Sequence, residues 1–445
     1  MTAPLGWLGI VRLGLVQTAL GAIVVLTTST LNRVMVVELA LPATLPGVLV
    51  ALHYGVQVLR PRWGHGSDIG GRLTPWILGG MAILALGGFG AATAVALMSA
   101  MFWPGVALAV LSFVLIGIGV GASGTSLLVL LSRRVADERR PAAATVVWVM
   151  MIAGFIVTAG LAGHFIDPFS TGRMVIVSGA VSAIAMIVTL LAVIGVEERA
   201  NHDARKTSAV ELVSFRIAIA EVWREPQARL FAIFVFVSMI AYSAQDLILE
   251  PFAGTVLGYS PGESTRLAGV QNGGVLVGMM LVALVTTLAG SKGGSLRAWA
   301  VGGCLASALA LAFLSAGALW GPGFSLRPVV FALGVANGAY AVAAIGLMMR
   351  LVGQGRRDRQ GVRMGLWGAA QGVAFGLGGL LGAGASDVAR RIAASPASAY
   401  AAVFTIEAVL FLVAAGLAVS VARQANDKAH RNAAQSDAAP ALNPG

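Results

Sequence analysis

The residues most able to do chemistry stand inside the first long apolar segment of the chain. Asn32, Arg33 and Glu38 place an amide, a cation and a carboxylate where hydrocarbon side chains are otherwise expected. A charge near the centre of a bilayer costs about 3 kcal/mol or more, so it usually faces a bundle interior and has a partner. A second polar group in a later apolar segment consists of Gln245, Asp246 and Glu250. We interpret the two groups as one intramembrane charge network.

Arg33 and Glu38 are five positions apart, which is about 140° around an α-helix, so they are not expected to pair. We predict instead that Arg33 meets Asp246 or Glu250 and so stabilises the contact between the two parts of the chain. The alternative is a direct role of Glu38, Asp246 or Glu250 in binding a substrate or a proton.

Composition assigns the protein class. Of the 445 residues, 58% are hydrophobic and 11% are charged, whereas about 25% charged residues are usual in soluble domains. The chain is therefore expected to be a multi-pass membrane protein. It has no phosphate-binding loop, zinc spacing or serine nucleophile elbow, and Cys304 is its single cysteine. We expect neither an enzyme, nor an ATP-driven pump, nor a metal held directly by the protein.

The elements that position these residues are long apolar helices. At about 20 apolar residues per membrane span, we count twelve segments. They cover residues 10–35, 43–60, 74–99, 103–131, 142–164, 173–196, 229–257, 264–290, 296–318, 328–352, 364–386 and 398–421. The predicted fold is an all-α integral membrane bundle.

The one long polar connection, at 197–227, divides the chain into six-helix halves. We predict an N-terminal half at 1–196, a cytoplasmic linker at 197–227, a C-terminal half at 228–422 and a disordered cytoplasmic tail at 423–445. Most Lys and Arg residues fall on one side if both termini are cytoplasmic, and this asymmetry orients a membrane protein. The net charge of +11 then reflects topology and attraction to anionic membrane lipid, and does not indicate nucleic-acid binding.

The halves look like diverged repeats. The polar group at 32–38 has a loose counterpart at 245–251, and 154–167 matches 375–387, with an aspartate ending each stretch. Between the second and third segments, Gly64, Asp68, Gly71 and Arg72 resemble the signature loop of the major facilitator superfamily. Parallel six-helix repeats are also the architecture of that superfamily. This resemblance implies a transporter-like bundle.

A narrower resemblance concerns function. Residues 30–39, 60–68 and 245–254 are similar to the signature stretches of the PucC family of photosynthetic bacteria. This resemblance implies a bacteriochlorophyll-delivery and light-harvesting complex assembly factor in the intracytoplasmic photosynthetic membrane. Its cargo would be bacteriochlorophyll or a late precursor. Its partners would be light-harvesting polypeptides and pigment biosynthesis enzymes.

A pigment site needs an axial ligand for magnesium and a surface for a flat ring. His53 is the candidate ligand, and Gln57 one turn later shares its face. Gln271 and Asn272 are the other candidate pigment-binding residues. Glycines in the 364–386 segment would give a smooth face for the ring, or they serve close helix packing. A buried histidine that only joins two helices is the alternative for His53.

Two functions remain open at this stage. The first is pigment delivery, as the PucC resemblance implies. The second is a proton-coupled secondary transporter of a small solute, acting through Glu38, Asp246 or Glu250. It predicts a cavity with alternating access and a solute flux that depends on a proton gradient.

Overall fold

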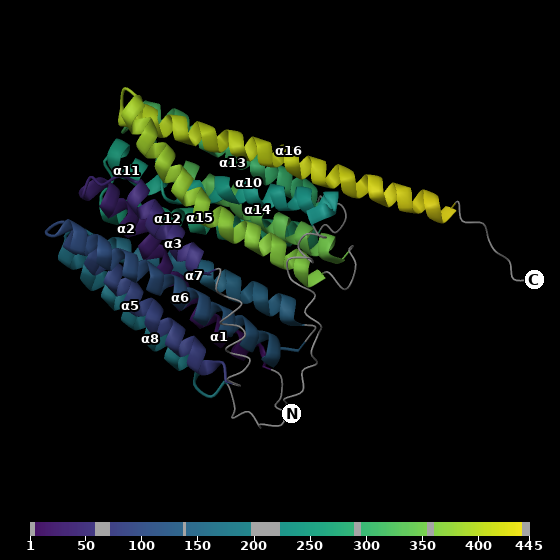
Figure 1. Cartoon of the computed structure of the whole chain (residues 1–445), viewed down its shortest axis with the longest axis horizontal. Coiled ribbons are helices and arrows are strands. Elements are labelled where there is room, and N and C mark those ends of the chain that lie inside the picture. Colours follow the sequence, from purple (N-terminus) through teal and green to yellow (C-terminus); the bar gives the residue numbers. More distant parts are fainter. Residues whose placement is uncertain are drawn as a thin grey trace, which may run out of the picture.

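The computed structural model describes residues 5–57, 72–136, 139–196, 223–288, 295–353 and 360–437. All regular structure within these ranges is helical, and the twelve predicted segments correspond to twelve helical rods (Figure 1). Eleven rods are long and apolar enough to cross a membrane, and the shorter one is the 13-residue α3. The predicted all-α membrane architecture is confirmed.

In the N-terminal half, the first rod is a single run of four pieces. They are α1 (Trp7–Val25), the π-helical η1 (Leu26–Thr30), α2 (Leu31–Arg33) and the π-helical η2 (Val34–Glu38). The remaining rods of this half are α3 (Thr44–Val56), α5 (Thr74–Met98), α6 (Phe102–Arg134), α7 (Arg140–Ile166) and α8 (Thr171–Val193).

In the C-terminal half, the first rod is broken into α10 (Pro226–Asp246) and α11 (Leu249–Leu257). The remaining rods are α12 (Pro261–Leu288), α13 (Leu296–Trp320), α14 (Leu326–Gly353), α15 (Gln360–Ile392) and α16 (Pro396–Asp437). Because backbone groups in lipid must be satisfied internally, apolar runs of this length form helices. Proline begins α10, α12 and α16, where its missing N–H costs nothing.

The two halves pair their helices in the same pattern. In the N-terminal half α1 packs on α7 and α8, while α5 packs on α6 and α8. The equivalent pairs in the C-terminal half are α10 with α15 and α16, and α13 with α14 and α16. Each half has its own large buried core. The principal contacts between the halves are α3 with α15 and α7 with α12, which are also equivalent under the repeat.

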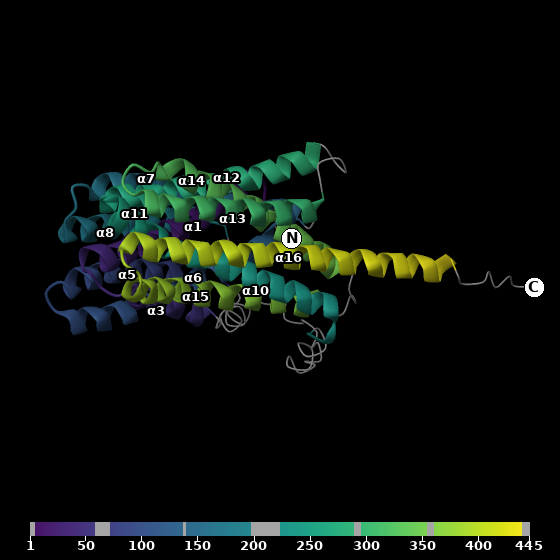
Figure 2. The same ribbon diagram turned by 90° about the horizontal axis from the view of Figure 1, so that it is seen from above.

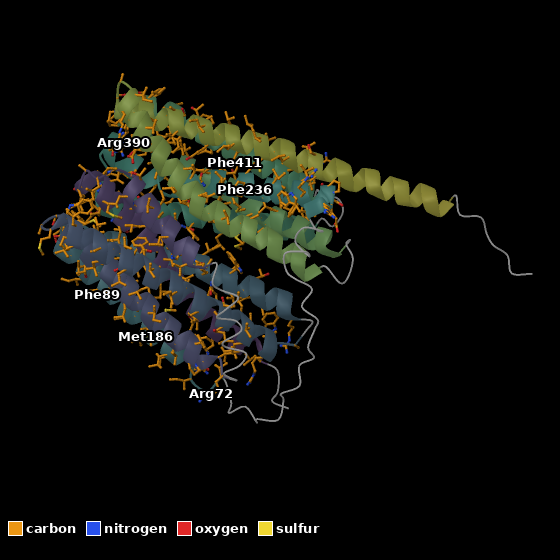
Figure 3. All side chains as sticks on the ribbon, viewed as in Figure 1. Arg72, Phe89, Met186, Phe236, Arg390 and Phe411 are labelled. Carbon is orange, nitrogen blue, oxygen red and sulfur yellow. The ribbon has the colours of Figure 1, made fainter. Side chains whose placement is uncertain are left out.

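The rods run along the long axis of the molecule, as Figures 1 and 2 both show. We call the end where the chain enters α1 the terminal end. The opposite, distal end carries the connections at 39–43, 167–170, 258–260 and 393–395. Figure 3 places Arg390 at the distal end and Arg72 at the other. Of the predicted signature loop, only the exposed Arg72 is described, and Gly64, Asp68 and Gly71 lie outside the described residues.

The C-terminal tail differs from the prediction of disorder from 423 onward. α16 continues as helix to Asp437 and projects beyond the other rods (Figure 2). The sequence after 422 is rich in Ala with Arg, Gln and Lys, which are good helix formers. A helix that already exists needs no new nucleus, so such a sequence extends it. Most of the predicted linker, 197–222, lies outside the described residues.

Candidate functional site

The distal half of the first rod departs from α-helical geometry. Its sequence from 27 to 30 is Thr-Thr-Ser-Thr, and the hydroxyls of Thr27 and Thr28 donate to the Val24 carbonyl at 2.8 and 3.0 Å. Hydroxyls that bond back in this way compete with the backbone ladder of a helix. Further along, the Leu39 N–H donates to the Val34 carbonyl, an i+5 bond of 3.0 Å. The rod therefore contains π turns.

The π geometry overturns the prediction that Arg33 and Glu38 do not pair. Arg33 Nη1 lies 2.5 Å from Glu38 Oε1. The expected 140° separation assumed an α-helix, whereas a π turn brings residues five apart onto one face. The direct ion pair that was predicted for Arg33 with Asp246 or Glu250 is not formed among the described residues, although Glu250 lies close enough to be attracted by the Arg33 charge. The cation is compensated within its own rod.

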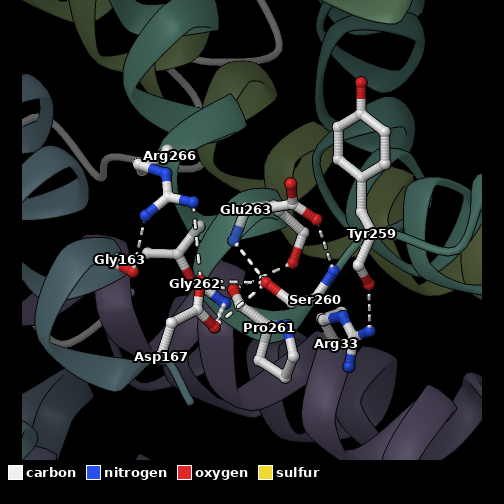
Figure 4. Close-up of polar contacts among 11 residues, drawn as sticks. Arg33, Gly163, Asp167, Tyr259, Ser260, Pro261, Gly262, Glu263 and Arg266 are labelled. Atoms are coloured by element: carbon white, nitrogen blue, oxygen red, sulfur yellow. Dashed lines mark hydrogen bonds and ion pairs between the residues drawn. The ribbon is translucent and has the colours of Figure 1, made fainter. Parts of the chain in front are cut away.

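The guanidinium of Arg33 also joins the two halves. Arg33 is 2% exposed, and its Nη2 donates to the Tyr259 carbonyl of the C-terminal half at 2.7 Å (Figure 4). A Cβ atom added at Gly254 of α11 would lie 2.8 Å from Nη2 and 3.0 Å from Nε. The guanidinium therefore packs directly on the backbone of α11, at a position that only glycine can occupy without displacing it.

This packing makes a testable prediction. Gly254→Ala forces the buried guanidinium of Arg33 to shift, so we expect it to lower the free energy of unfolding by about 2 kcal/mol, as overpacking does. The matched control is Gly160→Ala in α7, where an added Cβ meets nothing within 4 Å. This control should be neutral or slightly stabilising. Thermal unfolding of both variants in detergent checks the prediction, and equal midpoints would contradict it.

Side chains of the first rod donate hydrogen bonds to polar groups at the break between α10 and α11. Asn32 Nδ2 donates to the Leu247 carbonyl at 2.9 Å, which replaces a backbone partner that the break removes. The Ser29 hydroxyl donates to the Glu250 carboxylate. Thr30 and Thr265 share a hydroxyl contact of 2.9 Å. The predicted contact between the first rods of the two halves is thus made mainly by uncharged groups.

The remaining residues of the predicted network lie in the C-terminal half. Asp246 is partly exposed and accepts a long 3.5 Å hydrogen bond from Gln271. Gln245 is fully buried, and neither of its amide atoms has a partner among the described residues. Sequence reasoning missed Glu407 of α16, which is 2% exposed, with both carboxylate oxygens unpaired within the described part of the chain. The sequence did contain a signal for Glu407, since it is a single charged residue within a long apolar run.

His53 and Gln57 share a face, as predicted. Their Nε2 atoms lie 2.9 Å apart, and His53 is 3% exposed. Because an amide nitrogen can only donate, Gln57 Nε2 engages the lone pair of His53 Nε2 that magnesium would need. In this conformation His53 therefore does not fit a macrocycle as an open axial ligand, because its Nε2 contacts Gln57 at the end of the same helix.

An aromatic bridge that the sequence did not reveal leads from His53 toward Asp246. The His53 and Tyr54 rings lie 4.8 Å apart, and Tyr54 lies 5.6 Å from Phe375 of α15. Phe375 in turn lies 5.8 Å from Tyr242 of α10. Tyr54, Phe375 and Tyr242 are all partly exposed. The spacing of Tyr242 four residues before Asp246 was the available signal, because it puts both on one helix face.

The other two candidate pigment residues belong to a different group of helices. Gln271 and Asn272 lie on α12, which packs mainly on α7 and α14. Asn272 Nδ2 donates to the Ala268 carbonyl of its own helix at 2.9 Å. His53 and Gln57 lie on α3, which packs mainly on α6 and α15. The four residues therefore do not form one cluster.

The glycines of α15 mostly serve helix packing. An added Cβ at Gly382 would lie 2.8 Å from the Ala244 carbonyl, and one at Gly379 would lie 2.9 Å from Leu247. At Gly376 it would lie 3.4 Å from Tyr54. Gly372 alone of these has open space around it. A smooth face for a flat ring is therefore limited to the part of α15 nearer the terminal end.

Asp167, at the end of α7, binds the beginning of α12 in the other half. Its carboxylate accepts hydrogen bonds from the Ser260 hydroxyl at 2.9 and 3.0 Å and from the Gly262 N–H at 3.1 Å. Arg266 of α12 pairs with it at 3.4 Å and also donates to the Gly163 carbonyl. Figure 4 shows these groups converging on one carboxylate.

Asp387, at the repeat-equivalent position of α15, binds the beginning of α3. It accepts N–H bonds from Ala43 at 2.9 Å and Thr44 at 2.7 Å, and Arg390 pairs with it. We call Asp167 and Asp387 the inter-half carboxylates. Each provides acceptors for N–H groups that the first turn of a helix leaves unpaired. Together they close the distal end from both sides.

Comparisons with known proteins agree on fold and family. A family model described as PUCC protein matches residues 30–426. The bacteriochlorophyll synthase 44.5 kDa chain of Rhodobacter capsulatus is 54% identical, over 94% of this chain and 96% of that protein. Protein PucC of the same organism is 29% identical, over 93% and 92% of the two chains.

Solved transporters share the fold at low sequence identity. The nucleoside transporter NupG superposes with a TM-score of 0.71 at 14% identity, covering 93% of this chain and 99% of that chain. A bacterial homologue of the lysosomal transporter Spinster gives 0.69 at 16% identity, covering 94% and 96%. The fold is therefore that of the major facilitator superfamily, in a multi-pass integral membrane protein. With the family match spanning almost the whole chain, this protein belongs to the PucC family.

Proposed function

We propose that this protein receives bacteriochlorophyll, or a late precursor of it, and delivers it to light-harvesting polypeptides as their complexes assemble. The observation that carries the proposal is the 54% identity, over 94% of the chain, to a protein named as a bacteriochlorophyll synthase chain. Identity at that level along nearly the full length supports a shared role in handling this pigment.

We further propose that the protein is a carrier and not the enzyme that makes the pigment. Within the described residues, no group of three or more His, Cys, Asp or Glu side chains is placed to hold a metal ion. Thr30, Asn32 and Arg33 of the first rod are engaged with the Thr265 hydroxyl and with backbone carbonyls of the C-terminal half. These contacts support a structural role for the polar residues, in which they hold the two halves together, more than a catalytic role.

We propose that the pigment ring contacts the aromatic bridge, which consists of Tyr54, Phe375 and Tyr242. Tyr54, Phe375 and Tyr242 come from three helices and both halves, and each is partly exposed. Aromatic side chains pack well on flat conjugated rings. The open position at Gly372, one turn before Gly376 on the same helix as Phe375, leaves room beside the bridge.

The test is pigment extraction and an absorption spectrum of protein purified in mild detergent from a pigment-producing host. We expect about one bacteriochlorophyll per chain in the wild type. Each aromatic contact contributes about 0.5–1.5 kcal/mol, so Tyr54→Leu with Phe375→Leu should lower the bound pigment by at least about fivefold. His53→Ala should retain pigment, because its Nε2 already contacts Gln57.

Phe89→Leu is the control, because Phe89 is a 45% exposed ring on α5 outside the bridge. A colourless wild type would contradict pigment delivery. If His53→Ala lost the pigment and the Tyr54→Leu, Phe375→Leu variant kept it, His53 would be the axial ligand of the pigment magnesium.

We propose that the protein lies in the intracytoplasmic photosynthetic membrane with both termini in the cytoplasm. The distribution of Lys and Arg along the sequence supports this orientation. Pigment biosynthesis enzymes would then be its donors and light-harvesting polypeptides its acceptors. Tagging either terminus and testing its protease accessibility in sealed membrane vesicles checks the orientation.

A second candidate function is proton-coupled transport of a small solute. The observation that favours it is the burial of Glu250 and Glu407, which are 3% and 2% exposed, in a fold shared with nucleoside and peptide transporters. Carboxyl groups inside transmembrane bundles commonly mark ion or proton pathways. Solute uptake into vesicles by a colourless protein, dependent on a proton gradient, would favour this function.

A further inference from the structure

A groove at the distal end runs between the two halves. It has a volume of about 390 Å³ and is lined by Thr44 of α3 and by residues of the last three turns of α15, from Leu380 to Arg391. Leu381 and Val388 on its wall are each 56% exposed. The groove is therefore mostly apolar and open to the surroundings of the bundle.

The charges at the end of the groove leave one cation uncompensated. Asp387 accepts the N–H groups of Ala43 and Thr44 and also pairs with Arg390, so its negative charge is already engaged. Arg391 is exposed and has no ion pair among the described residues. The polar end of the groove therefore has a net positive charge.

The length of the groove matches one leaflet of a bilayer. Arg391 lies eleven positions after Leu380, and at 1.5 Å per position this stretch of α15 spans about 17 Å. Half of a hydrocarbon core of about 30 Å is about 15 Å. The charged end lies at the distal end of the bundle, and the apolar wall runs from there toward the middle of the membrane.

We propose that this groove binds an anionic phospholipid, with its phosphate on Arg391 and one acyl chain along Leu380, Leu381 and Val388. Arginine binds phosphate through paired N–H groups. Because Thr44 belongs to the N-terminal half and the rest of the wall to the C-terminal half, the bound lipid bridges the halves. It therefore stabilises the distal contact that Asp387 makes beneath it.

The test uses the full chain, stripped of lipid in detergent and then titrated with phosphatidylglycerol or with phosphatidylcholine of the same acyl chains. Native mass spectrometry counts bound lipid, and thermal unfolding reports stability. We expect phosphatidylglycerol to bind about tenfold more tightly and to raise the unfolding midpoint more. Arg391→Gln should abolish this preference. Leu381→Trp, which fills the space for the acyl chain, should weaken the binding of both lipids.

Arg327→Gln is the matched control, since Arg327 is an exposed arginine at the same distal end that lies outside the groove. Equal binding of the two lipids by the wild type would overturn the proposal. So would an Arg391→Gln variant that loses stability equally with and without lipid, because Arg391 would then only stabilise the end of α15. Bound pigment in place of lipid would also overturn it.

Discussion

Glu38→Gln should destabilise the protein by about 2 kcal/mol, because it removes the ion-pair partner of the buried Arg33 guanidinium. The Arg33 side chain is only 3% exposed, whereas that of Glu38 is 35% exposed. The cation is thus the group that cannot return to water. An SDS or thermal unfolding titration of the purified protein in detergent measures the loss.

The double variant Arg33→Met with Glu38→Gln should be more stable than Glu38→Gln alone. Replacing a buried pair by apolar or neutral groups of similar volume is often close to neutral, so the two substitutions should couple by more than about 1 kcal/mol in a double-mutant cycle. The lost contact to the Tyr259 carbonyl keeps the double variant below the wild type.

Asp246→Asn serves as the comparison, because the one side-chain hydrogen bond of Asp246 within the described residues is a long 3.5 Å contact with Gln271. We expect it to cost less than about 1 kcal/mol. If Asp246→Asn proved as damaging as Glu38→Gln, and coupled to Arg33→Met, the cation would be paired across the halves and the π-turn pairing would be wrong.

Removing both inter-half carboxylates should open the distal end. Each caps the first turn of a helix in the opposite half, and loss of such a cap costs about 1.5 kcal/mol, or roughly tenfold in an equilibrium. Asp167 and Asp387 lie on separate helix pairs, so their effects should be nearly additive. The double variant Asp167→Ala with Asp387→Ala should therefore open about 100-fold more often.

A buried reporter cysteine measures this opening. Ala383 of α15 is 1% exposed and packs on Val36 and Ala43 of the other half, so Ala383→Cys becomes reactive only when the distal contact separates. The native Cys304 is fully buried and is replaced by serine to remove background. Thiol labelling should be about tenfold faster in each single aspartate variant and about 100-fold faster in the double variant.

Glu263→Gln is the control for this experiment. Glu263 is a carboxylate at the same distal end, but it accepts the Ser260 N–H within its own half at 2.9 Å. It should not change the labelling rate. Labelling that stays at the wild-type rate in the double aspartate variant would show that apolar packing alone holds the distal end closed.

The sequence was sufficient wherever one physical constraint acts on a single segment. Apolar runs of about 20 residues must satisfy their own backbone in lipid, so the number of helical rods and their approximate bounds followed from composition. The repeat was also visible, because 154–167 and 375–387 both end on an aspartate. The contact between His53 and Gln57 could also be predicted, because residues four apart in one helix share a face.

The partner of Arg33 was predicted incorrectly because the prediction assumed uniform α-helical geometry. The hydroxyl run that begins at Thr27 was present in the sequence and was a signal of an irregular helix. Its consequence, an i+5 register that brings Glu38 to Arg33, depends on how the rod packs. The same holds for Glu407, whose burial depends on helices that are distant in the sequence.

The sequence by itself therefore determined a membrane bundle of two related halves, its polar centre and its family resemblance. Tertiary structure alone decided which groups of different helices meet. The partners of Asp167 and Asp387 are helix N-termini in the opposite half, and the aromatic bridge joins α3, α15 and α10. Local sequence sets the shape and polarity of each helix, but the contacts between helices depend on how all twelve pack together.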